Sequence, residues 1–210
     1  AYDPRGQEVA STIVQLLKKA GVSFAIMGPN ETCTGDPARR LGEEALYQEL
    51  AMTNVENMKA FNVKKVIANC PHCFNTLKNE YPDFGSDVEV VSHSEFLNDL
   101  VKQGKLSPTK NINEEITYHD PCYLGRHNRV FDEPREILTA IPGLEIKELD
   151  RSRENSFCCG AGGGKVWMEE EAPRVNWNRF DEIQNHGVET VSYTHLRAHE
   201  TRHDLVCRLL

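Results

Sequence analysis

The sequence predicts an α/β protein built from two tandem, similar, cysteine-rich domains with short, mostly parallel sheets. Three observations favour this fold class. Helical and strand-like patterns alternate along the chain, two stretches come into register when the sequence is shifted by 125 residues, and the cysteines fall where predicted strands end or predicted helices begin. In an open α/β unit, that position is the sheet edge where ligands bind.

The predicted elements of the first half alternate between helix and strand. Apolar residues at helical spacing predict a helix over residues 8–20, which Gly21 would end. A long helix is expected from Asp36 to Met58, because the following Pro37 suits a first turn. The remaining elements are strands over 22–27, 64–69 and 88–91 and helices over 74–81 and 95–103.

The second half repeats this order after a linker. Residues 104–113 are rich in Gly, Ser, Pro, Asn and Lys, which favours a connecting segment. Beyond it we expect strands over 115–119, 144–149 and 189–192 and helices over 133–141 and 166–185. The sequence therefore predicts a first domain over residues 1–104, a second over 114–192 and a tail over 193–210 that belongs to neither.

The composition is typical of a globular protein and excludes several classes. Hydrophobic residues make up 39% of the chain and charged residues 27%, and the net charge is −8. An acidic chain is a poor binder of nucleic acid or anionic membranes, which attract basic surfaces. The apolar runs are far shorter than the roughly 20 residues of a membrane span, and no secretory signal is visible. A cytoplasmic location is therefore expected.

The cysteines carry the most functional information. The chain has seven of them, an odd number that includes the adjacent pair Cys158 and Cys159, and this fits a disulfide framework poorly. Clustered thiols in a reducing compartment are typical of metal ligands or redox groups, whereas a lone cysteine is commonly inert and buried. The cysteines are Cys33, Cys70, Cys73, Cys122, Cys158, Cys159 and Cys207.

The string Cys70-Pro71-His72-Cys73 follows a predicted strand and begins a predicted helix. Two thiolates separated by two residues can converge on one metal or cluster, and a helix N-terminus stabilises their negative charge. An iron–sulfur site is favoured, because a thioredoxin-type dithiol leaves no place for Cys33 and a zinc ribbon would have its second pair nearby. Zinc, a redox dithiol and an inert core remain alternatives.

Residues 158–164 read Cys-Cys-Gly-Ala-Gly-Gly-Gly. The run fails as a phosphate-binding loop, since Val166 follows Lys165 where Ser or Thr is needed, and as a dinucleotide fingerprint, since Lys165 replaces the third glycine. Glycines beside cluster ligands permit tight turns and let N–H groups approach sulfur, which raises the potential of the cluster. A merely flexible loop is the alternative interpretation.

The string His119-Asp120-Pro121-Cys122 ends a predicted strand and supplies the first cysteine of the second half. His119 and His127 could suggest a Cys–His nucleophile. No third orienting residue is evident, so we expect His119 to form a hydrogen bond near the site or to lie on the surface. Tyr118 and Tyr123 are expected to pack around the site, and no general acid or base is assigned.

These motifs resemble a known family. Cys122-x35-Cys158-Cys159-Gly160 and Cys33-x36-Cys70-x2-Cys73 are similar to the cysteine-rich CCG domains of the heterodisulfide reductase B-subunit type. The strings at 31–37, 70–74 and 158–164 most closely resemble iron–sulfur oxidoreductases with two such domains. That group passes electrons from electron-transfer flavoprotein or other flavin dehydrogenases towards quinone. The resemblance implies [4Fe–4S]-type clusters bound by Cys33, Cys70 and Cys73 and by Cys122, Cys158 and Cys159.

The resemblance also implies further parts and one alternative activity. A complete member has an N-terminal ferredoxin-like segment and often a membrane segment. Thr34 replaces a second adjacent cysteine of the pattern, which suits a cubane cluster in the first domain. The second domain keeps Cys158 and Cys159, and in relatives that richer set holds a noncubane cluster able to cleave disulfides. A heterodisulfide-type reductase is thus one alternative, and a zinc-stabilised interaction module is another.

Each half lacks part of its expected cysteine set. Shifted by 125 residues, Cys70 and Cys73 fall on His195 and Ala198, and the equivalent of Cys122 would precede residue 1. Residues 194–201 resemble translated sequencing-adapter DNA, so a native CxxC is expected to have been replaced there. Because metal binding is coupled to folding in such sites, we expect this chain to assemble clusters poorly.

Overall fold

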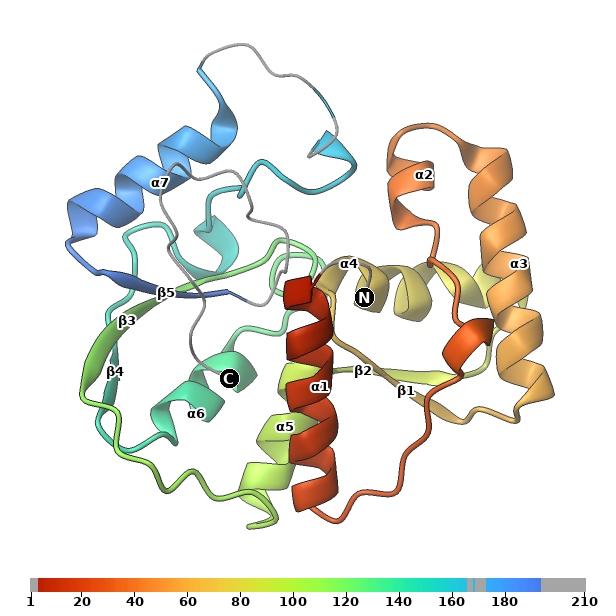
Figure 1. Ribbon diagram of the computed structural model, residues 1–210. Helices are drawn as coiled ribbons and strands as arrows, with labels where there is room; N and C mark the ends of the chain where they lie inside the picture. The colour runs from red at the N-terminus through yellow and green to blue at the C-terminus, as the bar shows by residue number, and fades with distance from the viewer. Residues whose placement is uncertain (1–3, 166–167, 169–172, 194–210) are drawn as a thin grey trace.

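The structure, a computed structural model, describes residues 4–165, 168 and 173–193. These residues form two α/β units that lie side by side (Figure 1). One contains a parallel pair of strands, β1 (Lys65–Ala68) and β2 (Glu89–Ser92). The other contains a three-stranded parallel sheet in the order β4-β3-β5. The predicted α/β class with two similar domains and short parallel sheets is confirmed.

The first unit surrounds its two strands with helices. In chain order these are α1 (Pro4–Lys19), η1 (Gly28–Asn30), α2 (Asp36–Arg40), α3 (Glu44–Ala60), α4 (Pro71–Asn75), η2 (Thr76–Glu80), η3 (Tyr81–Phe84) and α5 (His93–Lys102). A capping box starts α5, because Ser92 Oγ accepts from Glu95 N while the Glu95 carboxylate accepts from Ser92 N. That cap turns the chain from β2 directly into α5.

The second unit is built around β3 (Glu114–His119), the central and most buried strand. It pairs with β4 (Leu144–Ile146) on one side and β5 (Thr190–Tyr193) on the other. Helices α6 (Asp132–Thr139) and α7 (Val175–His186) lie below and above this sheet in Figure 1. A short turn, η4 (Arg153–Asn155), precedes the cysteine pair.

Apolar side chains fill four clusters that link these elements. One packs α1 against α5. A second packs α3 against η3 through Tyr47 and Tyr81, both fully buried. A third joins the two units, since Ala68 and Phe74 of the first contact Leu124 and Val130 of the second. The fourth lies between β3 and α6. No helix among the described residues is long and apolar enough to cross a membrane.

The structure corrects four of the predicted elements. Residues 22–27 form no strand: Val22 and Phe24 pack on the α1–α5 cluster, but Ile26 is 72% exposed and the segment pairs with no strand among the described residues. The helix expected over 36–58 is two helices, because Gly42 adopts a left-handed conformation (φ 89°) between α2 and α3.

The helix expected over 166–185 begins only at Val175; most of residues 166–172 lie outside the described residues. The strand expected over 144–149 ends at Ile146, where its pairing with β3 stops. The other expected elements are present within a few residues. The segment 104–113 contains no helix or strand and connects α5 to β3.

Candidate functional site

Two parallel strands, one in each unit, lead directly into cysteines. β1 ends at Ala68, shortly before Cys70, and β3 ends at His119, shortly before Cys122. In Figure 1 the start of α4 lies beside the loop that follows β3, between the two units. The carboxyl ends of the strands thus supply cysteines to neighbouring places, as expected for ligand sites in α/β units.

In the first half, Cys70 and Cys73 form a hydrogen-bonded thiol pair. Each is half-buried. The hydrogen bond between the two thiols lowers the pKa of Cys70, and the same bond together with burial raises the pKa of Cys73 well above its usual range. Thr34 Oγ1 also donates to Cys73 Sγ, at 3.5 Å. The pair therefore loses its first proton more easily than an isolated thiol does and holds the second more tightly.

Cys33 is exposed, and its backbone is held by a buried amide. Asn54, on α3, donates to the Cys33 carbonyl at 3.0 Å and accepts from Thr32 Oγ1 at 2.9 Å. The Tyr81 hydroxyl donates to the Thr34 carbonyl at 3.1 Å. Burial is the main cause of the raised pKa of Tyr81, and the charges of Cys73 and Cys33 add to it. Both thiols therefore lie near this phenol, which stays protonated.

In the second half, backbone N–H groups already point at the sulfur atoms. Gly160 N–H donates to Cys158 Sγ at 3.3 Å, and Ala161 N–H donates to Cys159 Sγ at 3.5 Å. Gly160 has φ 75°, and a Cβ there would lie 2.9 Å from the backbone nitrogen of Asn176. Glycine is thus required here by both backbone conformation and space. The turn that results presents donors to the two thiols.

The three cysteines of the second half also influence one another's ionisation. Burial and then the neighbouring charge of Cys159 raise the pKa of Cys122. A hydrogen bond with Cys159, followed by burial, raises the pKa of Cys158 well above its ordinary value, and Cys122 adds to this effect. The ionisation of Cys122 and that of Cys158 thus both depend on Cys159, although more than thirty residues separate Cys122 from the pair.

A buried ion pair supports this second group of thiols. Arg135, on α6, donates to both carboxylate oxygens of Asp120, at 2.7 and 2.9 Å. The same carboxylate accepts from Arg153 N at 2.7 Å, and the Asp120 carbonyl accepts from Ser156 Oγ at 3.1 Å. Asp120 thereby ties the end of β3, two residues before Cys122, to the loop that leads into Cys158.

Sequence reasoning missed the role of Asp120 and Arg135. Asp120 is part of the string that ends in Cys122, and this position alone could have indicated a role at the site. Arg135 gave no signal, because nothing in the sequence indicates that α6 places a guanidinium beneath β3. Although burial opposes the charged form, the carboxylates of Asp120 and Glu148 raise the pKa of Arg135, so this cation remains charged.

The histidine before the second site is buried and accepts a hydrogen bond. His119 is 2% exposed, and its Nδ1 accepts from Arg179 Nε at 3.0 Å. This fits the expectation of a hydrogen-bonded histidine near the site and disfavours a solvent-facing base of a Cys–His nucleophile. Tyr118 is also buried, with Arg135 over its ring at 5.0 Å. Tyr123 stacks on His127 with ring centroids 4.5 Å apart.

The donor chemistry of both groups fits an iron–sulfur cluster. Both offer thiols, the soft ligands that such clusters use, and the second adds N–H···S hydrogen bonds. Among the described residues, no three side chains of His, Cys, Asp or Glu lie close enough to enclose a single metal ion. A cluster of several irons is wider than one ion, so its ligands stand further apart. His195, Ala198 and Cys207 lie outside the described residues.

Comparison with known proteins agrees with these motifs. The sequence model of the family described as "CCG: Cysteine-rich domain" matches residues 1–78 and 116–195. The chain is 53% identical over 183 residues to "Probable iron-sulfur-binding oxidoreductase FadF" of Bacillus subtilis, covering 87% of this chain and 26% of that protein. It is 47% identical over 191 residues to "EtfAB:quinone oxidoreductase" of Syntrophomonas wolfei, covering 87% of this chain and 27% of that protein.

A third relative has a different named activity. It is one of the subunits of the dihydromethanophenazine:CoB–CoM heterodisulfide reductase of Methanosarcina mazei. The two chains are 44% identical over 162 residues, which covers 74% of this chain and 40% of that protein. The chain therefore spans about a quarter of the length of the first two relatives and two fifths of the third.

Proposed function

This chain belongs to the cysteine-rich CCG domain family, and from that membership we propose that it is part of an iron–sulfur oxidoreductase that transfers electrons. The observation that supports the proposal is the second thiol group, where backbone N–H groups donate to Cys158 and Cys159 and where the charge of Cys159 raises the pKa of Cys122. A duplicated arrangement of thiols, one copy of which receives such donors, serves an inorganic cofactor better than it serves a packed core.

We assign one cluster site to each half. Cys33, Cys70 and Cys73 would hold the first, within a domain over residues 1–104, and Cys122, Cys158 and Cys159 the second, within a domain over 114–192. A bound cluster would accept and release single electrons. The N–H groups of Gly160 and Ala161 would stabilise the negative charge that reduction adds. We expect [4Fe–4S] clusters in both sites, with a noncubane cluster at Cys158 and Cys159 as the alternative for the second.

The partners follow from the named relatives. Their names associate electron-transfer flavoprotein and quinone with one relative, so we propose a flavoprotein or flavin dehydrogenase as electron donor and a quinone or another oxidant as acceptor. Contact with a quinone would bring the complete protein to a membrane. The described residues would contribute the relay between donor and acceptor, while the oxidation of the organic substrate would take place on the donor.

Metal analysis tests the iron–sulfur proposal. The chain is purified anaerobically, reconstituted with iron and sulfide, and assayed for iron, acid-labile sulfide, zinc and visible absorption. We expect brown protein that contains iron and sulfide. Cys158→Ser should lose about half of the bound iron, since one of two sites is damaged, while Cys207→Ser, a change at a cysteine assigned to neither site, should lose none. Colourless protein that binds zinc without sulfide would instead support a zinc-stabilised interaction module.

A second candidate function rests on the adjacent thiols. Cys158 is exposed and lies beside Cys159, and one relative is named as part of a heterodisulfide reductase. Such an activity would reduce a disulfide to two thiols, taking two electrons from a donor and two protons from solvent. Reduced viologen dye with an organic disulfide tests it. Dye oxidation that depends on the disulfide and on Cys158 would support this candidate. If no such oxidation occurs, electron transfer between partners remains the proposed function.

A further inference from the structure

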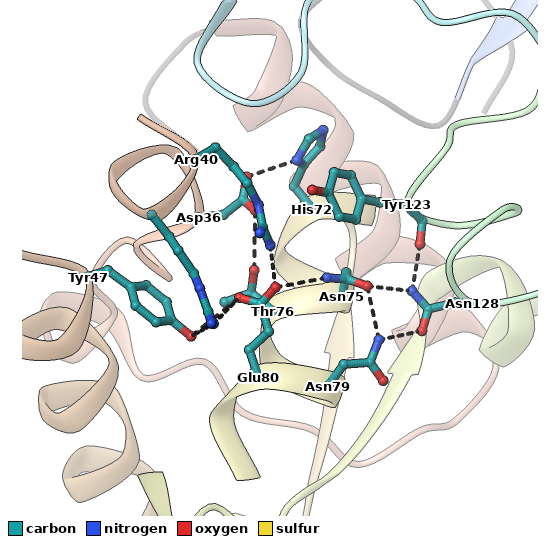
Figure 2. A network of polar contacts seen from close by, with 11 residues as sticks. Asp36, Arg40, Tyr47, His72, Asn75, Thr76, Asn79, Glu80, Tyr123 and Asn128 are labelled. Atoms are coloured by element: carbon teal, nitrogen blue, oxygen red, sulfur yellow. Dashed lines mark hydrogen bonds and ion pairs between the residues drawn. The ribbon is translucent and has the colours of Figure 1, made fainter. Parts of the chain in front are cut away.

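His72, inside the CxxC string of the first half, sits at the contact between the two units. Its side chain is almost buried, with Nδ1 2.8 Å from Asp36 Oδ2. Its ring centroid lies 4.4 Å from that of Tyr123, which directly follows Cys122 of the second half. Figure 2 shows the ring of His72 between Asp36 on one side and Tyr123 on the other. The histidine therefore belongs to one half and packs against the other.

The glycine run of the second half makes room for this ring. A Cβ built on Gly162 would lie 2.9 Å from both Cε1 and Nε2 of His72, closer than real Cβ contacts come. Gly162 is absent from the residues with positive φ, unlike Gly163 and Gly164. Backbone conformation therefore does not require glycine at 162. Glycine is required at 162 because His72 fills the space that a side chain would take. Leu41 fills the space beside Gly164 in the same way.

A set of amides fastens the other cysteine-bearing segment to the same helix. Asn128 Nδ2 donates to Asn75 Oδ1 at 3.1 Å, and Asn79 Nδ2 donates to Asn128 Oδ1 at 2.9 Å. Asn128 also donates to the Tyr123 carbonyl at 2.6 Å. The loop that begins at Cys122 is thus attached to α4 and η2, directly after Cys73 (Figure 2). Both cysteine segments of the second half contact the CxxC helix of the first.

A buried network holds His72 in place. Asp36 is 3% exposed, and its carboxylate also accepts from Arg40 Nε at 3.1 Å and from Thr76 Oγ1 at 3.4 Å. Arg40 forms a second ion pair with Glu80, and its guanidinium lies 5.3 Å from the centre of the Tyr123 ring. Buried polar networks of this kind fix side-chain positions, because each group would be costly to leave unpaired. The ring of His72 therefore has one defined orientation.

We propose that His72 is a positioning residue that holds the glycine run and the Cys122 loop against the CxxC helix, and so sets the separation of the two cysteine sites. The inference deepens the proposed function, on which its consequence for electron transfer rests. Electron tunnelling slows steeply as two centres move apart, so a small displacement of the glycine run would slow transfer between the sites without removing any ligand.

Thiol reactivity in the second half tests this contact in the metal-free full chain. Iodoacetamide is added under native conditions, and mass spectrometry follows the alkylation of the half-buried Cys122 and Cys159. His72→Ala should raise both rates at least about threefold, because the segments that carry them open more often. His72→Asn should do the same, since it keeps a donor for Asp36 but lacks the ring atoms that face Gly162. His127→Ala, an exposed histidine on the same tyrosine, should change neither rate.

Gly162→Ala supplies the reciprocal perturbation. In the parent it should raise the two alkylation rates, because the new methyl group displaces the ring. Combined with His72→Ala it should add almost nothing, since the space is then vacant, and this non-additivity identifies the pair. Parental rates in His72→Ala, His72→Asn and Gly162→Ala, or an additive double variant, would overturn the proposal. If the variant His195→Cys with Ala198→Cys bound no iron after reconstitution, the proposed function would be refuted, and these rate changes would be unaffected.

Discussion

The buried pair of Asp120 and Arg135 offers the sharpest test of how the second cysteine site is held. Asp120→Asn keeps the size of the side chain but removes its charge and turns an amide donor towards groups that only donate. Three hydrogen bonds of 2.7 to 2.9 Å are affected, two from Arg135 and one from Arg153 N. Both side chains are at least nine-tenths buried. Loss of one partner from a buried ion pair costs about 3–5 kcal/mol.

A second carboxylate reduces this cost. Arg135 also donates to Glu148, at 2.8 Å to Oε2, and this partner would remain in the variant. Glu148 is 40% exposed at its side chain, so it offsets only part of the loss. We therefore expect Asp120→Asn to lower the free energy of unfolding by about 2–4 kcal/mol. Urea unfolding followed by circular dichroism measures this value.

The control for this variant makes the same chemical change at the surface. Glu89→Gln breaks an ion pair with Lys65 whose partners are both largely exposed, and we expect it to cost less than about 1 kcal/mol. In Asp120→Asn the loop before Cys158 should also loosen, which faster alkylation of Cys159 would reveal. A stability loss below about 1 kcal/mol, equal to that of the control, would show that this ion pair does not support the site.

Three other perturbations test separate parts of the structure. Asp36→Asn should reduce the loss of stability that the parent shows between about pH 5 and pH 2. Burial opposes ionisation of Asp36, but the hydrogen bond and charge of His72 and the charge of Arg40 lower its pKa below 3.8. The carboxylate therefore stabilises the fold above that pH, and this contribution is lost as the pH falls through the folded pKa. Equal acid sensitivity of parent and variant in urea titrations would contradict this. Gly160→Ala should cost about 2 kcal/mol, since it combines a left-handed backbone with a 2.9 Å contact to Asn176 N, and unfolding midpoints measure it. His195→Cys with Ala198→Cys should raise iron content after reconstitution, and no gain would count against the 125-residue repeat.

The spacing of apolar residues along the sequence predicted those helices and strands whose structure depends on burying one apolar face. The amphipathic helices α1, α5 and α6 and the short apolar strands β1 to β3 appear within a few residues of their expected positions. The same spacing gave wrong predictions where an element also needs a partner elsewhere in the fold. Residues 22–27 are as apolar as a strand, but no strand edge pairs with them among the described residues, and a strand without a partner leaves its backbone groups to solvent. Gly42 divided a helix whose apolar spacing continued across it.

The proposed chemistry of the sites came from the sequence alone, because candidate thiolate ligands stand out by residue type and spacing. The α/β order, the repeat and the six candidate ligands all came from such local signals. Only the tertiary structure decided what supports those ligands: the Asp120–Arg135 pair beneath one site, and the ring of His72 against Gly162 between the two. Those contacts join residues 15 and 90 positions apart, and their partners are chosen by the packing of α4, α6 and the loops upon one another. The spacing of residues along the sequence does not predict which residues make these contacts.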